Sequence, residues 1–124
     1  MSALVDTSIL IDYLRGDPRA GELLERERAR DALQASEITR LEILAGMRRE
    51  DEHQTRLLLS TLVWHPVDAA VAEEAGALGS WLASHHTIDS ADLAIAATAI
   101  CTGTRLLTRN IKHFPMFSDL QAPY

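Results

Sequence analysis

The sequence has very little cysteine and no long apolar run, and each shortage excludes a class of protein. Cys101 is the single cysteine among 124 residues. No disulfide can therefore form within the chain, and a reducing compartment is the natural environment. No apolar stretch approaches the roughly 20 residues that a membrane-spanning helix needs, and Asp6 interrupts any leader-like segment at the N-terminus. We therefore expect a cytoplasmic protein with no membrane partner.

Basic side chains are also scarce. Twelve Lys and Arg stand against eighteen Asp and Glu, which gives a net charge of −6 and argues against a protein that coats nucleic acid by bulk electrostatics. No Lys or Arg lies between residues 57 and 104, although five acidic residues do. Carboxylates without nearby cations are either solvated or bound to a metal.

Short apolar segments alternate with longer amphipathic ones along the whole chain. We expect strands over residues 3–5, 32–35, 63–67 and 105–108. The helices are expected over residues 9–14, 18–30, 36–47, 50–62, 68–84 and 90–101, the last of them buried on most of its faces and ended by Gly103. This alternation predicts one α/β unit, residues 1–124, with a parallel sheet covered by helices on both sides.

Asp6 directly follows the first expected strand, where open parallel sheets place functional groups. As a good N-cap residue it has a simple structural explanation. Thr7 and Ser8 are equally good caps, however, which leaves Asp6 available for chemistry.

Glu42 lies on the apolar side of its expected helix, beside Ala45 and Gly46. Burying a lone carboxylate there costs several kcal/mol, so Glu42 is either a ligand or an internal ion pair with Arg40 or Arg109.

Asp92 is the only charged residue between Asp89 and Arg105 and lies in the first turn of the most apolar helix. Its neighbours in sequence provide no counter-ion. Asp89 and Asp92 also fit a capping pair without chemistry; we interpret Asp89 as the cap and Asp92 as functional. Asp6, Glu42 and Asp92, together with Asn110 in the turn after the last expected strand, offer only oxygen atoms as ligands. Such a donor set favours Mg²⁺ or Mn²⁺ over zinc.

Four segments carry a family resemblance. They are Asp6-Thr7-Ser8, residues 36–46 (SEITRLEILAG), residues 92–99 (DLAIAATA) and residues 107–114 (LTRNIKHF). In this order and spacing they resemble the motifs of PIN-domain ribonucleases, specifically the VapC-type toxins of toxin–antitoxin pairs, over essentially the entire chain.

The resemblance implies a three-layer α/β/α sandwich with a parallel sheet of four or five strands. It also implies a Mg²⁺-dependent endoribonuclease (with Mn²⁺ as the alternative ion) that leaves a 3′-hydroxyl and a 5′-phosphate, a small inhibitory antitoxin partner, and a homodimer. Asp6, Glu42 and Asp92 correspond to the acidic site residues, with Asp6 and Asp92 as metal ligands and Thr7 and Asn110 as supporting polar groups. Arg15, Arg40 or Arg109 would bind flanking phosphates.

One position departs from the family pattern: Asn110 stands where many members have a fourth acid, which leaves the number of metal ions open. It also motivates an alternative, a catalytically silent PIN-like module that binds RNA or a protein. A phosphatase resembling the haloacid dehalogenases is disfavoured because residue 8 is Ser, not the second Asp of their Asp-x-Asp motif.

The remaining notable side chains are expected to be structural. The five histidines show no metal-ligand spacing and are predicted on the surface or in loops, with His113 near enough to Asn110 to approach RNA. Trp64 and Trp81 are expected in the core or an interface, and Cys101 as a small side chain in a buried helix.

Overall fold

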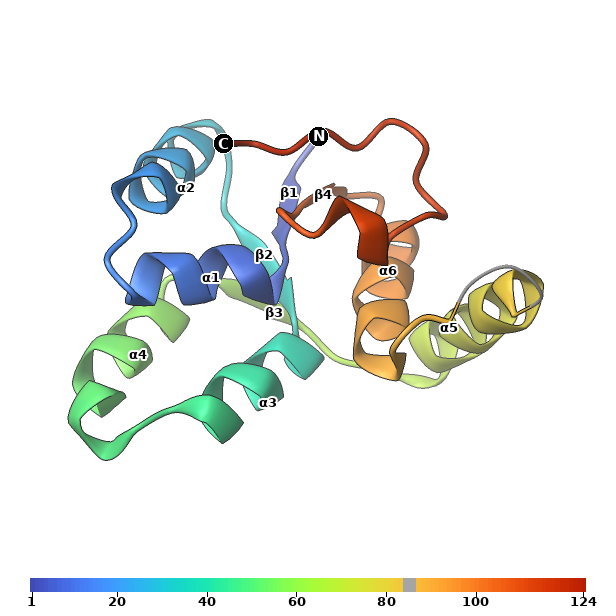
Figure 1. Cartoon of the computed structure of the whole chain (residues 1–124), viewed down its shortest axis with the longest axis horizontal. Helices are drawn as coiled ribbons and strands as arrows, with labels where there is room; N and C mark the ends of the chain where they lie inside the picture. Colours follow the sequence, from blue (N-terminus) through green and yellow to red (C-terminus); the bar gives the residue numbers. More distant parts are fainter. Residues whose placement is uncertain (84–86) are drawn as a thin grey trace.

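The computed structural model describes residues 1–83 and 87–124, which contain one sheet of four parallel strands (Figure 1). The strands are β1 (Ala3–Val5), β2 (Gln34–Ser36), β3 (Val63–His65) and β4 (Arg105–Leu107). Their order across the sheet is β3-β2-β1-β4, so the N-terminal strand lies inside the sheet and the last strand pairs with it. The expected parallel sheet is confirmed, with four strands.

Six α-helices connect and cover these strands in the described part of the chain. They are α1 (Thr7–Leu14), α2 (Pro18–Arg30), α3 (Glu37–Gly46), α4 (Glu52–Leu59), α5 (Ala69–Leu82) and α6 (Ser90–Thr102), with short 3-10 turns η1 (Arg49–Asp51) and η2 (Ile111–His113). None of these helices has the length and apolar character that crossing a bilayer requires.

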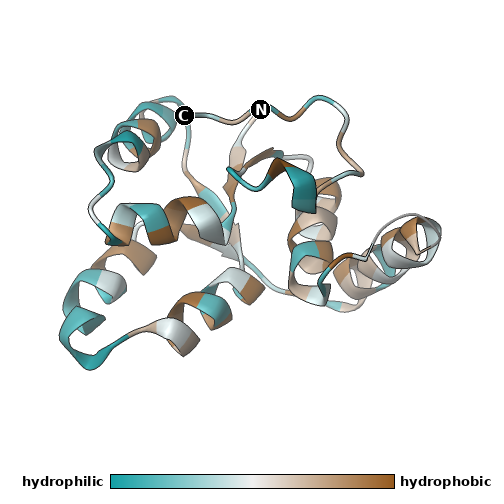
Figure 2. Cartoon of the chain, in the orientation of Figure 1, coloured by the Kyte–Doolittle hydropathy of each residue, from teal (hydrophilic) through white to brown (hydrophobic). Residues whose placement is uncertain are grey.

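Two apolar clusters cover the two faces of the sheet, because successive strand residues point to opposite sides. Ala3 and Val5 face one cluster, built mainly with α1, α2 and α4, whereas Leu4 faces the other, built with α6 and Phe114. Helix α5 packs on the outside of α6 (Figure 1). Most of α6 is apolar or neutral along its length (Figure 2), which agrees with the six consecutive buried residues of Ala94–Ala99.

Local sequence signals explain most helix ends. Asp17 accepts a bond from the Arg19 backbone N–H ahead of α2, and Ser36 and Asp68 cap α3 and α5 in the same manner. Gly103 ends α6 in the left-handed conformation, with φ of 66°, which glycine adopts without steric cost. The end of α6 at Gly103 was predicted from the same residue.

Several boundaries and environments differ from the sequence-based expectations. The strands expected over 32–35 and 63–67 lie at 34–36 and 63–65, and the helix expected over 50–62 is η1 followed by the shorter α4. Helix α5 ends at Leu82, and the expected end at Ser84, with His85 and His86, lies outside the described residues.

Two single side chains, Cys101 and His65, also differ. Cys101 is exposed rather than packed inside, because α6 turns its last residues toward solvent. Trp81 is 72% exposed on α5, which rules out the core for this residue and leaves the interface as its expected place. His65 is half-buried in β3 and bonded to Gln34 rather than placed in a loop. Trp64, by contrast, packs against the core as expected.

Candidate functional site

The site begins at the carboxyl end of β1, where the chain turns into α1. The Asp6 backbone N–H donates to the Leu107 carbonyl at 2.9 Å, which holds the end of β1 against the end of β4. Asp6 stands at the N-cap position of α1, but its side chain makes no capping bond. The carboxylate is therefore available for other contacts, as its sequence position suggested.

The Asp6 side chain is buried, with 3% of its surface exposed, and it is held by two hydroxyl groups. Ser8 Oγ and Thr108 Oγ1 both donate to Asp6 Oδ2, at 2.8 and 2.7 Å. Within the described chain no hydrogen bond reaches Oδ1, although no buried side-chain oxygen there lacks a partner. Oδ1 is therefore the carboxylate oxygen left to bind a ligand.

Thr108 connects this carboxylate to the turn that follows β4. Its hydroxyl donates to Asp6 and accepts from the Asn110 backbone N–H at 2.9 Å. The Asn110 side chain is exposed, so this residue reaches the carboxylate through its backbone amide and Thr108. The parallel register, in which Val5 lies opposite Leu107, places position 108 beside position 6.

Glu42 comes from α3 and meets the first turn of α1. Thr7 Oγ1 donates to Glu42 Oε1 at 2.7 Å and lies 3.0 Å from the hydroxyl of the buried Thr39. Thr7 and Asp6 are adjacent in sequence, so this contact holds Glu42 near the end of β1. The Thr7 side chain thus occupies the supporting position expected of it.

The alternative for Glu42, an internal ion pair, is not what the described residues form. Arg40 pairs with Glu37 and stacks on Trp64, while Arg109 pairs with Asp12 at 3.0 Å. The expectation that Glu42 lies on a fully buried face was also wrong. It is half-buried, and the neighbouring Ala45 and Gly46 are exposed because this side of α3 lines an open cleft.

Asp92, in the first turn of α6, has the most perturbed carboxyl group of the site. Burial raises its pKa to about 6 from an ordinary 3.8, the imidazole of His113 acts in the opposite direction, and the charges of Asp6, Asp89 and Glu42 raise it further. These three carboxylates are therefore close enough to repel the charge of Asp92. The charges of Asp6 and Glu42, which are far from Asp92 in the sequence, therefore act on it in the fold.

Asp92 gains from the fold a contact that its neighbours in sequence do not provide. His113 Nδ1 lies 3.1 Å from Asp92 Oδ2, because η2 carries residue 113 back over the start of α6. Asp89 stands at the N-cap position, as interpreted, but its side chain makes no capping bond. Asp89, Asp92 and His113 instead line a hollow of about 210 Å³ with Lys112.

The donor set is suited to a hard divalent cation. The described residues contain no group of three His, Cys, Asp or Glu side chains arranged to enclose a metal ion. Mg²⁺ does not require such a cage, because it keeps several waters and is usually bound by one or two carboxylates. Asp6 and Asp92 supply two carboxylates that repel each other, and a cation between them would relieve that repulsion.

The contact between His113 and Asp92 was not expected from the sequence. Thr108, by contrast, follows the last strand as Asp6 follows the first, so the rule that located Asp6 also places a polar group at position 108. For His113 no signal exists in the sequence, because its distance from Asp92 depends on how the chain after β4 folds.

The arginines expected to bind phosphates form no ion pair with any of the three acids in the described part of the chain. Arg15 is exposed on the cleft beside Glu42, and Arg109 is held by Asp12.

A family model, curated relatives and a solved structure each match most of the chain. A family model described as the PIN domain matches residues 3–117. Ribonuclease VapC19 of Mycobacterium tuberculosis is 44% identical over 123 residues, 98% of each chain, and Ribonuclease VapC10 of the same organism is 34% identical over 98% of this chain and 92% of its own. A solved toxin–antitoxin complex from Klebsiella pneumoniae contains a chain with a TM-score of 0.85 and 33% identity, covering 99% of this chain and 98% of that one.

Proposed function

The chain belongs to the PIN domain family, and from this premise we propose that it is a metal-dependent endoribonuclease acting as the toxin of a VapBC-type toxin–antitoxin pair. The relatives named Ribonuclease VapC and the likeness to a toxin–antitoxin complex support this assignment. The match over residues 3–117 supports treating residues 1–124 as a single PIN-like domain.

One observation carries the proposal: Asp92 is a desolvated carboxyl group whose pKa three other carboxylates raise. A fold maintains such repulsion at the edge of its sheet when a bound cation offsets it. The hydroxyl groups of Ser8 and Thr108 hold Asp6 in place, and this supports a ligand role for Asp6 because metal-binding carboxylates are oriented by such bonds.

Each acidic residue then has a distinct role. Asp6 and Asp92 would hold the ion, for which Mg²⁺, or Mn²⁺, fits an all-oxygen donor set. A bound divalent ion supplies Lewis-acid activation of water and charge stabilisation in phosphodiester hydrolysis. Glu42, positioned by Thr7, orients the attacking water, and the Asn110 turn supports Asp6 through Thr108.

The remaining parts of the assignment follow from the family. We place the protein in the cytoplasm, where its RNA substrate occurs, as a homodimer inhibited by a small antitoxin protein that covers the site. Exposed arginines, with Arg15 beside Glu42, would contact the phosphates that flank the cut.

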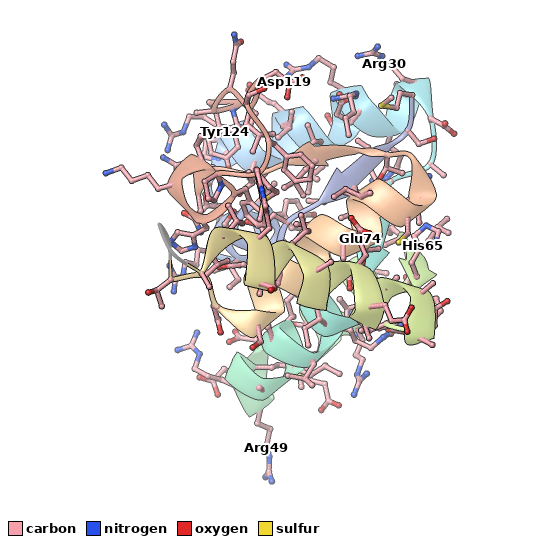
Figure 3. The ribbon with its side chains drawn as sticks, turned by 90° about the vertical axis from the view of Figure 1, so that its right-hand side faces the viewer. Arg30, Arg49, His65, Glu74, Asp119 and Tyr124 are labelled. Carbon is pink, nitrogen blue, oxygen red and sulfur yellow. The ribbon has the colours of Figure 1, made fainter. Side chains whose placement is uncertain are left out.

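Cleavage of RNA by the purified protein tests the proposal. We expect the wild type to cut a structured RNA in the presence of Mg²⁺ or Mn²⁺ and to leave 5′-phosphate ends, and Asp6→Asn to reduce cutting to background. Asp119→Asn is the matched control, since Asp119 is an exposed acid in the C-terminal segment (Figure 3) and lines a different hollow. Metal-independent cutting, or cutting that survives Asp6→Asn, would contradict the assignment. RNA binding without cutting would instead support the silent module.

A further inference from the structure

A cleft of about 590 Å³ lies between α1, α3, η1 and α4. Glu42 forms part of its wall, so the cleft opens directly beside the proposed reaction site. Apolar side chains from α1 and α3 line its inner part; they are Ile11, Leu14, Ile43 and Met47. Arg49, on η1, projects away from the body of the molecule at this end (Figure 3).

The cleft also contains polar groups that could bind a ligand with both an anionic and an apolar part. Arg15 lines the cleft and forms no ion pair with any described residue, whereas Arg48 is bonded to Asp51 at 2.8 Å. Gln54 contributes a side-chain amide from α4 on the far side. An unpaired guanidinium binds phosphate well, and an amide can both donate to and accept from a base edge.

We propose that this cleft holds one nucleotide of the RNA substrate next to the bond that is cut, and thereby selects the base at that position. This inference rests on the proposed function. The base would lie against the apolar side chains, its edge would meet Gln54, and its phosphate would pair with Arg15. Recognition of RNA sequence usually depends on such unstacked single-stranded bases.

The dimensions and charge favour a nucleotide over a segment of a partner protein. Pockets of about 300–1,000 Å³ suit small ligands and single groups, whereas a stable protein interface needs about 800 Å² from each partner. The free cation of the cleft complements a phosphate, and half of its named lining is charged or polar.

Gly46 allows the cleft to be filled without disturbing the fold. A Cβ at this position meets no atom within 4 Å, its φ is not positive, and it stands one turn after Glu42 on α3. Helical side chains lean toward the N-terminus, so Gly46→Leu would extend into the cleft. Gly76→Leu is the matched control, because Gly76 is equally open but lies on α5.

The experiment measures kcat and KM on an RNA that the wild type cuts, together with the bases around cut sites in total RNA. For Gly46→Leu we expect an unchanged melting temperature and a KM raised by about 10-fold to 100-fold, the range for loss of one stacked base. Gln54→Ala should relax the base preference at one position beside the cut. Gly76→Leu should match the wild type in all measurements.

Other outcomes overturn the inference. Unchanged KM and base preference in Gly46→Leu, with wild-type cleavage intact, would reject the cleft while leaving the proposed function standing. A fall in kcat alone would assign the effect to Glu42, and loss of antitoxin binding alone would make the cleft a protein-docking groove. If the wild type cuts no RNA, the proposed function and this inference both fail.

Discussion

At the residue scale, acids of one chemical type behave differently because their surroundings differ. Asp6 is buried and held by two hydroxyl groups, Asp68 is exposed and caps a helix, and Asp92 is desolvated among other carboxylates. The surroundings of Asp92 raise its pKa to about 6, close to the pH of cells. Asp92 is therefore the residue whose replacement should reveal the electrostatic state of the site.

Asp92→Asn should stabilise the metal-free protein at neutral pH but not in acid. The pKa of Asp92 is raised from 3.8 to about 6, so the folded state binds more protons than the unfolded state between those values, and its stability falls as pH rises through them. Asparagine removes this cost, which is at most about 2–3 kcal/mol above pH 6 and absent below about pH 4.

Thermal melts in EDTA across this pH range would measure the effect, with Asp119→Asn as the control for loss of an exposed charge. A difference between variant and wild type that stays constant from acid to neutral pH would show that charge repulsion at Asp92 is not its cause.

At the element scale, an acidic residue at a helix start need not be a cap. Asp17 and Asp68 accept backbone N–H bonds at the starts of α2 and α5. Asp6 and Asp89 occupy the same position before α1 and α6 without any such bond. Helix α4 also starts without a side-chain cap, but α1 and α6 are the uncapped helices that border the proposed metal site.

Replacing the two kinds of N-cap residue should therefore have opposite results. Asp68→Ala removes the 3.0 Å bond to the Val71 N–H and should lower the free energy of unfolding by about 1 kcal/mol. Asp89→Ala removes no capping bond and relieves repulsion of Asp92, so the metal-free protein should lose nothing or become more stable. Urea unfolding at neutral pH would compare them, and equal losses would refute this distinction.

At the scale of the whole molecule, the parallel sheet gathers segments that are distant in sequence. β1 and β4 are neighbours in the sheet, so residues 6 and 108 meet at its carboxyl edge. Helices α3 and α6 bring Glu42 and Asp92 to the same edge. The molecule carries a net charge of −6, and its acidic site is therefore expected to depend on a divalent cation for stability as well as for RNA binding.

Mg²⁺ should raise the melting temperature of the wild type in a concentration-dependent manner. Binding to the folded state alone adds about 2.7 kcal/mol when free ion exceeds the dissociation constant 100-fold. Asp6→Asn should reduce the shift strongly, and Asp119→Asn should retain it. An identical shift in Asp6→Asn, or none in the wild type at high millimolar Mg²⁺, would argue against a metal held by Asp6 and Asp92.

The sequence was enough to identify the candidate site residues, but not the contacts that each of them makes. Asp6 was identified because it follows a strand, and Asp92 because an isolated charge interrupts an apolar helix. Glu42 was identified on a face that proved half-open, since spacing along a helix does not show what lies opposite. The contact of His113 with Asp92 depends on how the chain folds after β4, and no local pattern encodes that.

The sequence alone determined the α/β class, the parallel sheet, most helix starts and the end of α6 at Gly103, because turn, cap and periodicity signals act within a few residues. Only the tertiary structure decided that Thr108 holds Asp6, that His113 faces Asp92, and that a cleft opens beside Glu42. Those contacts join residues separated by 21 to 102 positions or by several helices. Such proximity follows from strand order and helix packing rather than from local preference.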